Sequence, residues 1–378
     1  MARIGIDIRV CNDHFPGIGR ATYGLTRALA ELPHGHTLVV LHNQRLANSR
    51  FDLAALGSMP GVTPVALPLS PFAPQNQWRV PLLARRLRLD LLHTPYYVAP
   101  YFGLPCPSVV TIYDIIGRRY PQYLSRRGRF FFERCMRLAT RHATQLLTGS
   151  ANARDDLIYA YNLTPERVTA IPFGVEERFR PQGEAAIAAL RQRYGLGERY
   201  VLYLGSNKPH KNQERLLRAW ERVAAEKPAL LDSWELVLAG HRDPRHDEGE
   251  RFVRERGIPR VRFLPDVPDS ELPALYSGAG LFAFVSFYEG FGLPVIEAMA
   301  CGAPVICAYA SSLPEVVGNA ALTVDPFSPI EIAEGLSRLL ANPVLRKQLR
   351  ESGLLQARRY SWRRAALRTL EVYERLVL

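Results

Sequence analysis

The sequence lacks the features that mark secreted, disulfide-bonded and membrane-spanning proteins. No stretch approaches the roughly 20 apolar residues that a spanning helix needs, and residues 1–8 open on strand-like alternation in place of a signal-peptide core. The cysteines contain no Cys-x-x-Cys pair, so we expect buried thiols in a reducing compartment. There are five: Cys11, Cys106, Cys135, Cys301 and Cys307. We therefore expect a cytoplasmic protein, with contact to the inner membrane face left open.

Low-complexity tracts are absent as well, so the composition is that of a soluble globular protein. At 378 residues the chain exceeds what one hydrophobic core usually covers, which favours two domains. Its charge is unbalanced, with a formal net charge of +12 at pH 7. This excess favours acidic partners such as nucleotide phosphates, anionic lipid surfaces or nucleic acid.

The most distinctive stretch is Ser-Phe-Tyr-Glu-Gly-Phe-Gly-Leu-Pro-Val-Ile-Glu at residues 286–297. The apolar run at residues 281–285 predicts a buried parallel strand immediately before it. Pro294 suits the first turn of a following helix, where its missing N–H costs nothing, and Gly302 suits the end of that helix. The stretch is therefore expected to connect a buried strand to a helix.

This strand-to-helix connection predicts a ligand site. Glu289 is expected in the loop and Glu297 in the first helical turn. In parallel α/β sheets, ligands bind at the carboxyl ends of the strands. Free N–H groups at a helix start attract phosphate, while Gly290 and Gly292 let a ligand approach the backbone closely. Two carboxylates beside such a loop indicate a phosphate-bearing ligand that also carries hydroxyl groups.

The first half of the chain also begins with a strand, a glycine-containing loop and a helix. Residues 4–8 predict the strand, and the helix is expected from Tyr23. Gly17 and Gly19 between them suit a phosphate contact, but Thr22 stands where the dinucleotide-binding fingerprint requires a third glycine. A plain tight turn and a ligand loop are both consistent with this spacing.

Two later strands of this half are expected to end in polar residues, one at His93 and one at Tyr113-Asp114. Polar side chains at the ends of parallel strands are candidate site groups. For His93, a functional and a structural role are equally consistent with the sequence. The proline-rich span at residues 60–74 is expected to be a long connection.

Arginines and aromatic residues alternate further along. Arg126, Arg127 and Arg129 precede Phe130–Phe132, and more arginines follow on the expected helix. Such a pattern suits an anionic membrane surface, where each basic residue adds about 1 kcal/mol. A solvated helix face with a buried aromatic edge is the simpler interpretation, and the sequence leaves both open.

The strand–helix alternation restarts after residue 174, where we place a domain boundary. A strand there leads into Gly-Ser-Asn-Lys-Pro-His-Lys-Asn at residues 205–212. Gly205 leaves space at the strand end, and Lys208 and Lys211 bring positive charge to a helix start, which suits a pyrophosphate. Lysines near a turn are often only solvated, but this loop corresponds in position to the one at Glu289. Two α/β units form a cleft, and such clefts are preferred ligand sites.

Together these motifs resemble those of glycosyltransferase family 4, a large family of retaining enzymes with the GT-B fold. The resemblance rests on residues 288–297, on the Ala-Met-Ala-Cys-Gly-Ala-Pro-Val-Ile that follows them, and on four shorter motifs in the family's order. These are Pro16–Arg20, Leu92–Pro95, Gly205–Asn212 and Ser312–Gly318. It implies an α/β chain with two Rossmann-like doubly wound domains facing a central cleft. The implied parts are an acceptor-side domain at 1–174, a nucleotide-sugar-binding domain at 175–360 and a C-terminal helix at 361–378 that crosses back to the first domain.

The resemblance also implies roles for individual residues. Glu297 is expected to hold the ribose hydroxyls of a nucleotide donor, and Lys211 its diphosphate. Glu289 is expected beside the donor sugar, where it binds hydroxyls and stabilises positive charge at the reacting carbon. Asp114 joins Glu289 and Lys211 as an expected catalytic residue. The remaining expected donor contacts are Phe291, Gly292, Leu293, Gly205, Ser206 and Lys208, with Gly17 and Gly19 from the other domain; His93 and Tyr113 are expected on the acceptor side.

Two positions depart from the family pattern. The family often has histidine before the aspartate, where this chain has Tyr113, and an arginine soon after the loop glycine, where it has Ser206-Asn207. A phenol can still donate a hydrogen bond, so Tyr113 is kept as a candidate. Lys208 is expected to replace the charge of the arginine.

The reaction that the resemblance implies is retaining transfer of a hexose from a nucleotide-diphosphate sugar to a glycan or lipid-linked acceptor in polysaccharide assembly. Mannose from GDP-mannose is favoured, and a base pocket near Leu264–Val267 would select the nucleotide. The chain has no Asp-x-Asp motif for a nucleotide-bound divalent ion, so we expect neither a metal nor another cofactor. The alternatives are a GT-B sugar-nucleotide epimerase or phosphorylase, or a non-catalytic nucleotide-sugar or nucleic-acid binder. Because the chain carries no recognisable nucleic-acid motif, we do not expect nucleic acid as a partner.

Overall fold

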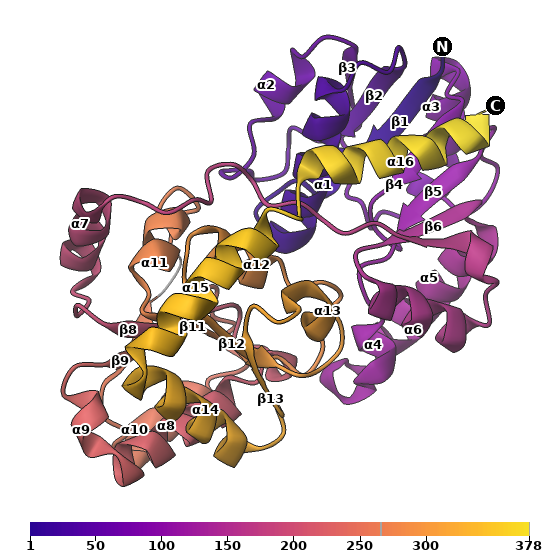
Figure 1. Ribbon diagram of the computed structural model, residues 1–378. Helices are drawn as coiled ribbons and strands as arrows, with labels where there is room; N and C mark the ends of the chain where they lie inside the picture. The colour runs from indigo at the N-terminus through magenta and orange to yellow at the C-terminus, as the bar shows by residue number, and fades with distance from the viewer. Residues whose placement is uncertain (265–266, 378) are drawn as a thin grey trace. The chain divides into compact units, whose positions relative to one another are not determined.

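The computed structural model of the protein describes residues 1–264 and 267–377 and separates into two units. The first unit comprises Met1–Gly174 and Ser361–Leu378, and the second comprises Val175–Tyr360. Each unit contains one parallel sheet flanked by helices (Figure 1). The alternation of apolar strands and amphipathic helices in the sequence is therefore realised twice.

The first unit has a seven-stranded parallel sheet in the order β3-β2-β1-β4-β5-β6-β7. Its central strands are buried because helices cover both faces, as a parallel sheet requires. The strands are β1 (Arg3–Asp7), β2 (Thr37–His42), β3 (Val62–Ala66), β4 (Leu91–Thr94), β5 (Ser108–Thr111), β6 (Gln145–Thr148) and β7 (Val168–Ala170). The α-helices are α1 (Pro16–Glu31), α2 (Leu53–Gly57), α3 (Asn76–Leu87), α4 (Ile116–Arg119), α5 (Arg126–His142), α6 (Ala151–Tyr161) and α16 (Trp362–Val377).

Strand β3 lies inside the span that the sequence predicts as a long connection, so that prediction was wrong. β3 pairs with β2 alone and forms an edge of the sheet. Pro64 within it cannot donate a hydrogen bond to a neighbouring strand, and an edge strand is where such a proline is tolerated. The prolines around residue 64 made the sequence look like a loop, whereas a strand is possible there because it lies at the edge of the sheet.

Helix α16 packs on the first unit, beside α1 and β4 (Figure 1). Gly24 of α1 faces the indole ring of Trp362 so closely that a Cβ atom would lie 2.4 Å from the ring. At the other end of the helix, the hydroxyl of Tyr373 lies 2.6 Å from Nδ1 of His93 in β4. A glycine contact and a buried polar contact therefore fix the C-terminal helix to this sheet.

The second unit has a six-stranded parallel sheet in the order β10-β9-β8-β11-β12-β13. The strands are β8 (Tyr200–Leu204), β9 (Glu235–Ala239), β10 (Val261–Leu264), β11 (Leu281–Phe284), β12 (Val305–Ala308) and β13 (Leu322–Val324). The α-helices are α7 (Glu184–Tyr194), α8 (Gln213–Glu226), α9 (Pro228–Leu231), α10 (Glu248–Arg256), α11 (Leu272–Gly278), α12 (Leu293–Ala300), α13 (Leu313–Val317), α14 (Pro329–Ala341) and α15 (Pro343–Ala357).

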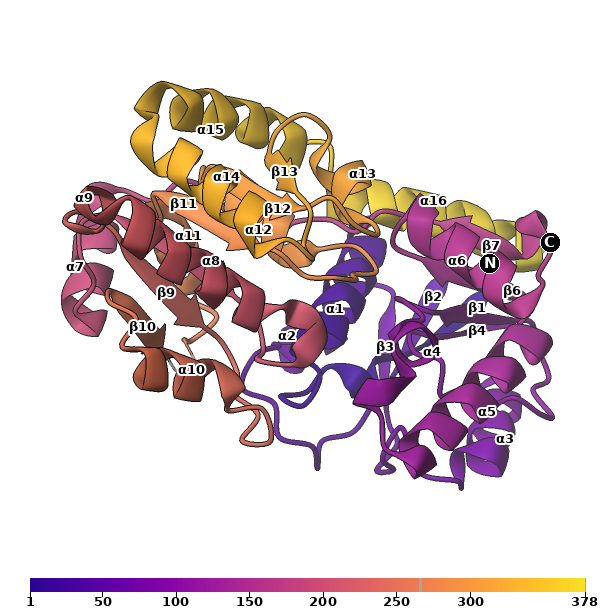
Figure 2. The ribbon, with the colours of Figure 1, turned by 90° about the horizontal axis from the view of Figure 1, so that it is seen from below.

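Alternate residues of the central strand β11 supply two separate cores. Leu281 and Ala283 join the core that contains residues of α8 and α14, two helices that lie side by side (Figure 2). Phe282 and Phe284 join the opposite core, with residues of α11 and α12. Because successive side chains of a strand point to opposite faces, an unbroken apolar run is needed for a strand buried on both sides.

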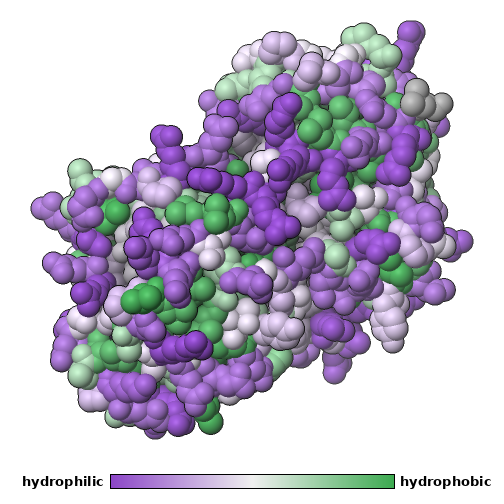
Figure 3. Space-filling view, in the orientation of Figure 1, coloured by the Kyte–Doolittle hydropathy of each residue, from purple (hydrophilic) through white to green (hydrophobic). Residues whose placement is uncertain are grey.

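The surface is largely polar. Figure 3 shows hydrophilic residues over most of one face, with hydrophobic residues in small separate patches. All five cysteines are free thiols, and four are buried, whereas Cys106 is partly exposed. In the part of the chain that the structure describes, no helix combines the length and apolar character that crossing a membrane requires.

Candidate active site

The second unit brings Lys211 and Glu289 together. Lys211 Nζ lies 2.6 Å from Glu289 Oε1, and the two side chains are only 19% and 13% exposed. The ammonium also lies 5.5 Å from the ring centre of Phe284. Lys211 follows β8 and Glu289 follows β11, and these strands are parallel neighbours. Their carboxyl ends therefore meet at one edge of the sheet, as the sequence predicts for a ligand site.

Two serines hold the loop that carries Glu289. The backbone N–H of Glu289 donates to Ser311 Oγ at 2.9 Å. The hydroxyl of Ser312, which is fully buried, contacts the carbonyl oxygens of Glu289 at 2.9 Å and Phe291 at 3.0 Å. Since the backbone is fixed on both sides of Gly290, the position of the Glu289 carboxylate is set before any ligand binds.

The loop that carries Lys211 is fixed in the same way, by Asn212. Asn212 adopts a left-handed conformation with φ of 62° and is 2% exposed. Its amide donates to the carbonyl oxygens of Val285 at 2.8 Å and Pro326 at 2.7 Å. The N–H of Phe287 donates to the carbonyl of His210 at 2.9 Å, which joins the two site loops directly. The Lys211–Glu289 contact therefore rests on a rigid frame.

Lysine charges dominate this loop because its histidine is neutral. Burial, together with the charges of Lys211 and Lys208, lowers the pKa of His210 to about 2. Lys208 is exposed and precedes the short turn Pro209–Lys211. The cationic side chains within residues 205–212 are consequently the two lysines that the sequence singles out.

The position where the family often has arginine carries a structural asparagine. Asn207 Nδ2 donates to the carbonyl oxygens of Asp243 at 3.0 Å and His246 at 2.6 Å, while its Oδ1 accepts from Asp243 N–H at 2.8 Å. Its side chain thus binds the loop after β9. The neighbouring carbonyl of Ser206 accepts from the hydroxyl of Tyr203 at 3.1 Å, so the protein's own contacts stabilise this part of the loop.

Glu297 is more deeply placed than the sequence predicts. It is the fifth residue of α12, so the expectation of the first helical turn was wrong and it lies in the second. It is 1% exposed, and its Oε2 accepts from the hydroxyl of Tyr276 at 3.0 Å. Burial raises the pKa of the Cys301 thiol to about 12, and the charge of Glu297 adds to this increase. The hydrogen bond from the Tyr276 hydroxyl orients the Glu297 carboxylate.

The residues between the two glutamates form the start of α12. Gly292 has φ of 105°, and a Cβ atom there would lie 2.7 Å from a methyl group of Leu313. Both the conformation and the packing thus require glycine. Leu293 begins the helix, and Pro294 stands in its first turn, as predicted. Phe291 is buried, with its ring packed edge-on against Tyr360 at 5.5 Å.

In the first unit, Gly17 and Gly19 lie in the opening turns of α1. The predicted loop was therefore wrong, since the helix begins at Pro16, whose missing N–H is not needed at a helix start. A Cβ atom on Gly19 would lie 2.8 Å from the ring of Phe51 and 3.0 Å from the carbonyl of Val10. A Cβ atom on Gly17 would meet nothing within 4 Å. Packing explains Gly19 and leaves Gly17 without a structural reason.

The two acceptor-side candidates, His93 and Tyr113, and the expected catalytic residue Asp114 have different surroundings. His93 is 1% exposed, with Nε2 2.7 Å from the hydroxyl of Thr111 and Nδ1 bonded to Tyr373, which favours the structural role. Burial lowers the pKa of His93 to about 3. Burial also raises the pKa of the partly exposed Tyr113 above its usual value. The carboxylate of Asp114 accepts from the N–H two residues ahead at 2.9 Å and is partly exposed.

Two known protein families match most of the chain. Glycosyltransferase Family 4 matches residues 16–179, and Glycosyl transferases group 1 matches residues 188–356. The O-antigen chain mannosyltransferase B of Escherichia coli is 34% identical over 286 residues, which cover 74% of this chain and 74% of that protein.

The chain belongs to glycosyltransferase family 4.

Other relatives of this family 4 glycosyltransferase agree. The MMP alpha-(1->4)-mannosyltransferase of Mycolicibacterium hassiacum is 31% identical over 69% of this chain and 61% of that protein. Among solved structures, the sucrose-phosphate synthase of Thermosynechococcus elongatus has a TM-score of 0.78 at 21% identity and covers 100% of this chain and 99% of that one. Anabaena HepE in complex with UDP and glucose has a TM-score of 0.78 at 20% identity, covering 100% of both chains. These confirm the predicted GT-B fold, and family membership confirms a hexosyltransferase.

Sequence reasoning missed four residues that position the site of this glycosyltransferase: Asn212, Tyr276, Ser311 and Ser312. Asn212 and Ser312 belong to recognised motifs, but a motif does not show that their side chains bond to the loop on the neighbouring strand. Tyr276 lies on α11, and only its hydroxyl contact with Glu297 reveals its role.

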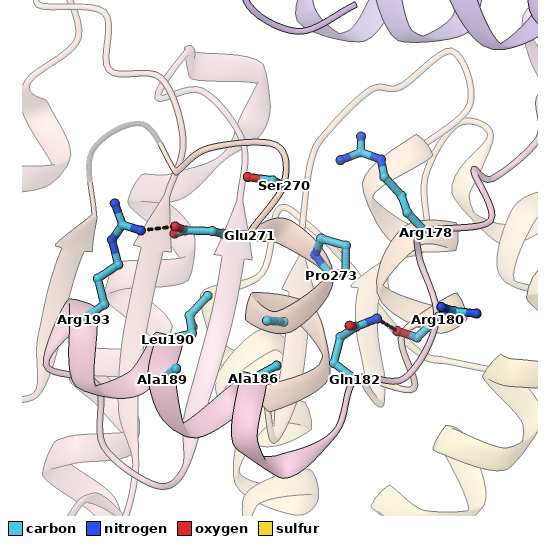
Figure 4. A pocket seen from close by; sticks show the side chains of 11 residues that line it. Arg178, Arg180, Gln182, Ala186, Ala189, Leu190, Arg193, Ser270, Glu271 and Pro273 are labelled. Carbon is cyan, nitrogen blue, oxygen red and sulfur yellow. Dashed lines mark hydrogen bonds and ion pairs between the residues drawn. The ribbon is translucent and has the colours of Figure 1, made fainter.

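A cavity of about 550 Å³ lies elsewhere on the second unit, between residues 178–182, α7 and α11 (Figure 4). Arg178 and Arg193 line it, but their charges are already paired, Arg178 with Glu176 at 2.9 Å and Arg193 with Glu271. None of the predicted donor-binding residues lines this cavity. We therefore assign it no part in the transfer reaction.

Proposed function

We propose that this glycosyltransferase moves mannose from a nucleotide-diphosphate sugar, GDP-mannose, to a glycan or lipid-linked acceptor during polysaccharide assembly, with retention of configuration. The observation that carries this proposal is the partly buried pair of Lys211 and Glu289 beside the start of α12. The Escherichia coli relative, an O-antigen chain mannosyltransferase, supports the sugar and the setting. The relative from Mycolicibacterium hassiacum, also a mannosyltransferase, supports the sugar.

Each part of a sugar nucleotide has a partner in this proposal. The ammonium of Lys211 binds the diphosphate, since it has three N–H donors and one contact to Glu289 leaves others available. Glu297, oriented by Tyr276, holds the ribose hydroxyls. Phe291, Gly292 and Leu293 offer backbone N–H groups to the phosphate or the sugar, helped by the helix start. Lys208, Gly205 and Ser206 complete the diphosphate contacts.

The chemistry follows from where charge develops. As the sugar–phosphate bond breaks, the ring carbon becomes positive and the leaving phosphate becomes more negative. Lys211 stabilises the leaving group and Glu289 the sugar, and both are fixed in place beforehand, which favours the transition state over the ground state. We propose that the departing phosphate takes the acceptor's proton, on the face from which it leaves. We further propose that the lysine charges serve in place of a metal ion.

The first unit supplies the acceptor side in this proposal. Gly17, whose surroundings leave open space, lets the diphosphate approach the start of α1. Asp114 follows β5 and remains partly exposed, so it can accept a hydrogen bond from an acceptor hydroxyl. Tyr113 lies beside it, with its hydroxyl 3.4 Å from that of Thr22. Because His93 is buried and bonded on both ring nitrogens, we no longer propose that it contacts the acceptor.

We also propose that a lipid-linked acceptor is reached through contact of α5 with an anionic membrane. Arg126, Arg127 and Arg129 are exposed in the first turn of this helix. The neighbouring Phe130 and Phe131 are 72% and 46% exposed, so the arginines accompany outward-facing aromatic rings. Such a surface combines charge attraction with shallow insertion of the rings. Sedimentation with phosphatidylglycerol vesicles, compared with phosphatidylcholine vesicles, tests this contact.

A thermal-shift screen followed by turnover measurements tests the donor assignment. GDP, UDP and ADP are compared first, because a bound ligand raises stability with the logarithm of its occupancy. The expected base pocket near Leu264–Val267 includes residues 265 and 266, which lie outside the described residues. GDP-mannose is then incubated with acceptor and without it. Stabilisation by GDP and acceptor-dependent release of GDP support the proposal, whereas rapid epimerisation without acceptor would favour the epimerase alternative.

A further inference from the structure

Three loops at one edge of the first unit carry aromatic side chains that the mechanism above does not use. The loops follow β1, β3 and β4, whose carboxyl ends lie at the same edge because the sheet is parallel. The sheet order places β4 beside β1, on the side opposite β2. From β1 the sheet therefore grows toward β3 on one side and, starting at β4, toward β7 on the other, so the strand order reverses between β1 and β4. The crevice at such a reversal is where open α/β sheets bind ligands.

The aromatic platform, as we define it, consists of His14, Phe15, Phe72 and Tyr96. The ring of Phe15 lies 4.6 Å from His14, 5.7 Å from Phe72 and 5.8 Å from Tyr96, centre to centre. Phe72 and Tyr96 are 5.9 Å apart and nearly perpendicular, at 88°. Phe72 is 37% exposed, and His14 is exposed as well. Four rings from three loops thus form one cluster, in which His14 and Phe72 are exposed and Phe15 and Tyr96 are partly buried.

A buried polar network holds the loops after β1 and β3 in place. Arg9 binds the carboxylate of Asp7 at 2.6 Å and Asn76 Oδ1 at 2.9 Å, and all three residues are at most 5% exposed. Asn76 in turn donates at 2.9 Å to the carbonyl oxygens of residues 70 and 71, next to Phe72. Asn12 Nδ2 donates to the carbonyl of Arg9, and Asn12 Oδ1 accepts from the N–H of residue 14. The platform is therefore preorganised by satisfied buried groups.

The platform lies near the loop that carries Asp114, because Tyr96 follows β4, Asp114 follows β5 and these strands are parallel neighbours. The Tyr96 ring lies 4.3 Å from that of Tyr97 between centres, with the two planes tilted by 37°. Burial raises the pKa of Tyr96, with further contributions from Tyr97 and from the negative charge of Asp114. A ligand that covers the platform would have its polar edge next to this carboxylate.

We propose that the aromatic platform binds a sugar ring of the acceptor glycan by stacking. A pyranose ring presents a face of C–H bonds and an edge of hydroxyls, which suits aromatic faces bordered by an imidazole, a phenol and a carboxylate. Aromatic rings that reach the surface on a backbone held by buried hydrogen bonds favour contact with the apolar face of a ligand. This inference rests on the proposed function and adds the class of acceptor that this site recognises.

Three substitutions test the platform. Phe72→Leu keeps apolar volume but removes the ring, whereas Phe72→Tyr keeps the ring. Phe102→Leu is the matched control, because Phe102 is 51% exposed in the same unit and its ring contacts Tyr101 and His142, outside the platform. Binding is followed by saturation-transfer NMR with an α-linked mannotriose and with the methyl glycosides of mannose, glucose, galactose and N-acetylglucosamine.

The expected result is specific to the ring. Phe72→Leu lowers affinity for the bound saccharide about tenfold, the effect of losing one aromatic stacking contact. Phe72→Tyr and Phe102→Leu bind as the wild type does, and all four proteins bind GDP equally and melt at similar temperatures. The KM for acceptor rises in Phe72→Leu, while hydrolysis of GDP-mannose in the absence of acceptor is unchanged.

Several outcomes would overturn the platform. The first is that Phe72→Leu binds saccharides as tightly as the wild type, and the second is that Phe102→Leu loses as much saccharide affinity as Phe72→Leu. The third is that the wild type binds none of the saccharides. The fourth is that Phe72→Leu loses vesicle binding but retains saccharide binding. Failure of the donor assignment has a different signature. In that case GDP-mannose is neither bound nor consumed, yet saccharide binding still depends on the ring of Phe72.

Discussion

Lys211 Nζ and Glu289 Oε1 lie 2.6 Å apart at the carboxyl ends of two adjacent strands, in side chains that are both largely removed from solvent. Partial burial strengthens the attraction between the charges, and it makes each charge costly to leave alone. A diphosphate that approaches this pair gains a cation that is already oriented. In our proposal the sugar then lies beside the carboxylate.

Replacing Lys211 tests the cation of this pair. Lys211→Ala removes the positive charge that the leaving phosphate needs, so we expect kcat to fall by about 10²–10³-fold and nucleotide affinity to fall as well. Stability should also decrease, because Glu289 is left partly buried without its partner. Steady-state kinetics and calorimetry with GDP provide the measurements. Lys227→Ala, at an exposed position after α8, is the control and should leave activity unchanged. Normal turnover by Lys211→Ala would contradict the assignment of Lys211 to the diphosphate.

Replacing Glu289 should separate turnover from nucleotide binding. Glu289→Gln keeps the size of the side chain but removes its negative charge, which in our proposal stabilises the reacting carbon. We expect kcat to fall at least about 100-fold while the Kd for GDP changes by only a few fold, since the loss falls on the transition state. Glu214→Gln, which alters an exposed glutamate paired with Arg218, serves as the control. A large loss of GDP affinity with kcat retained would reverse this role.

Glu297 and Tyr276 should give the opposite pattern. Glu297→Ala is expected to weaken nucleotide binding chiefly, because the ribose contact is made in the ground and transition states alike. Tyr276→Phe removes only the hydroxyl that lies 3.0 Å from Glu297, and we expect a milder increase in the Kd for GDP, of about fivefold, from one lost hydrogen bond. Calorimetry with GDP and with its 2′-deoxy analogue checks the assignment. Equal losses for the two nucleotides in Glu297→Ala would show that the ribose hydroxyl is not its partner.

His93 predicts how stability changes with pH. Its pKa is about 3 in the folded protein against 6.5 for an unperturbed histidine, so below pH 6.5 the unfolded chain binds a proton that the folded chain does not. The free energy of unfolding should therefore fall by up to about 1.4 kcal/mol per pH unit as pH decreases from 6.5 toward 3. Urea unfolding of the wild type and His93→Gln at several pH values provides the test. If the free energy of unfolding of His93→Gln depended on pH as steeply as that of the wild type, His93 would not be the source of the pH dependence.

The sequence predicted the Lys211–Glu289 region well, because the motif order identified which loops follow which strands. It could not predict Ser311 or Asn212 as supports, since hydrogen bonds between loops on neighbouring strands leave no periodic pattern. It placed Glu297 one turn too early because Pro294 indicates the first turn without fixing the first residue. It missed β3 because Pro64 argues against a strand unless the strand is known to lie at an edge.

The glycines of α1 provide a matched pair in which stability and function should separate. A methyl group at Gly19 would lie 2.8 Å from the ring of Phe51 and 3.0 Å from the carbonyl of Val10, so Gly19→Ala should destabilise the protein by about 1–3 kcal/mol through overpacking. Gly17→Ala meets open space in a helix, where alanine is favoured, so stability should be unchanged or slightly increased. If a diphosphate approaches this turn, however, the same methyl group should reduce transfer activity in a protein that remains fully folded. Thermal denaturation and turnover of GDP-mannose, measured on both variants, test the two expectations independently. Full activity in a stable Gly17→Ala protein would remove this turn from the proposed donor contacts, because no packing defect would then mask the absence of an effect.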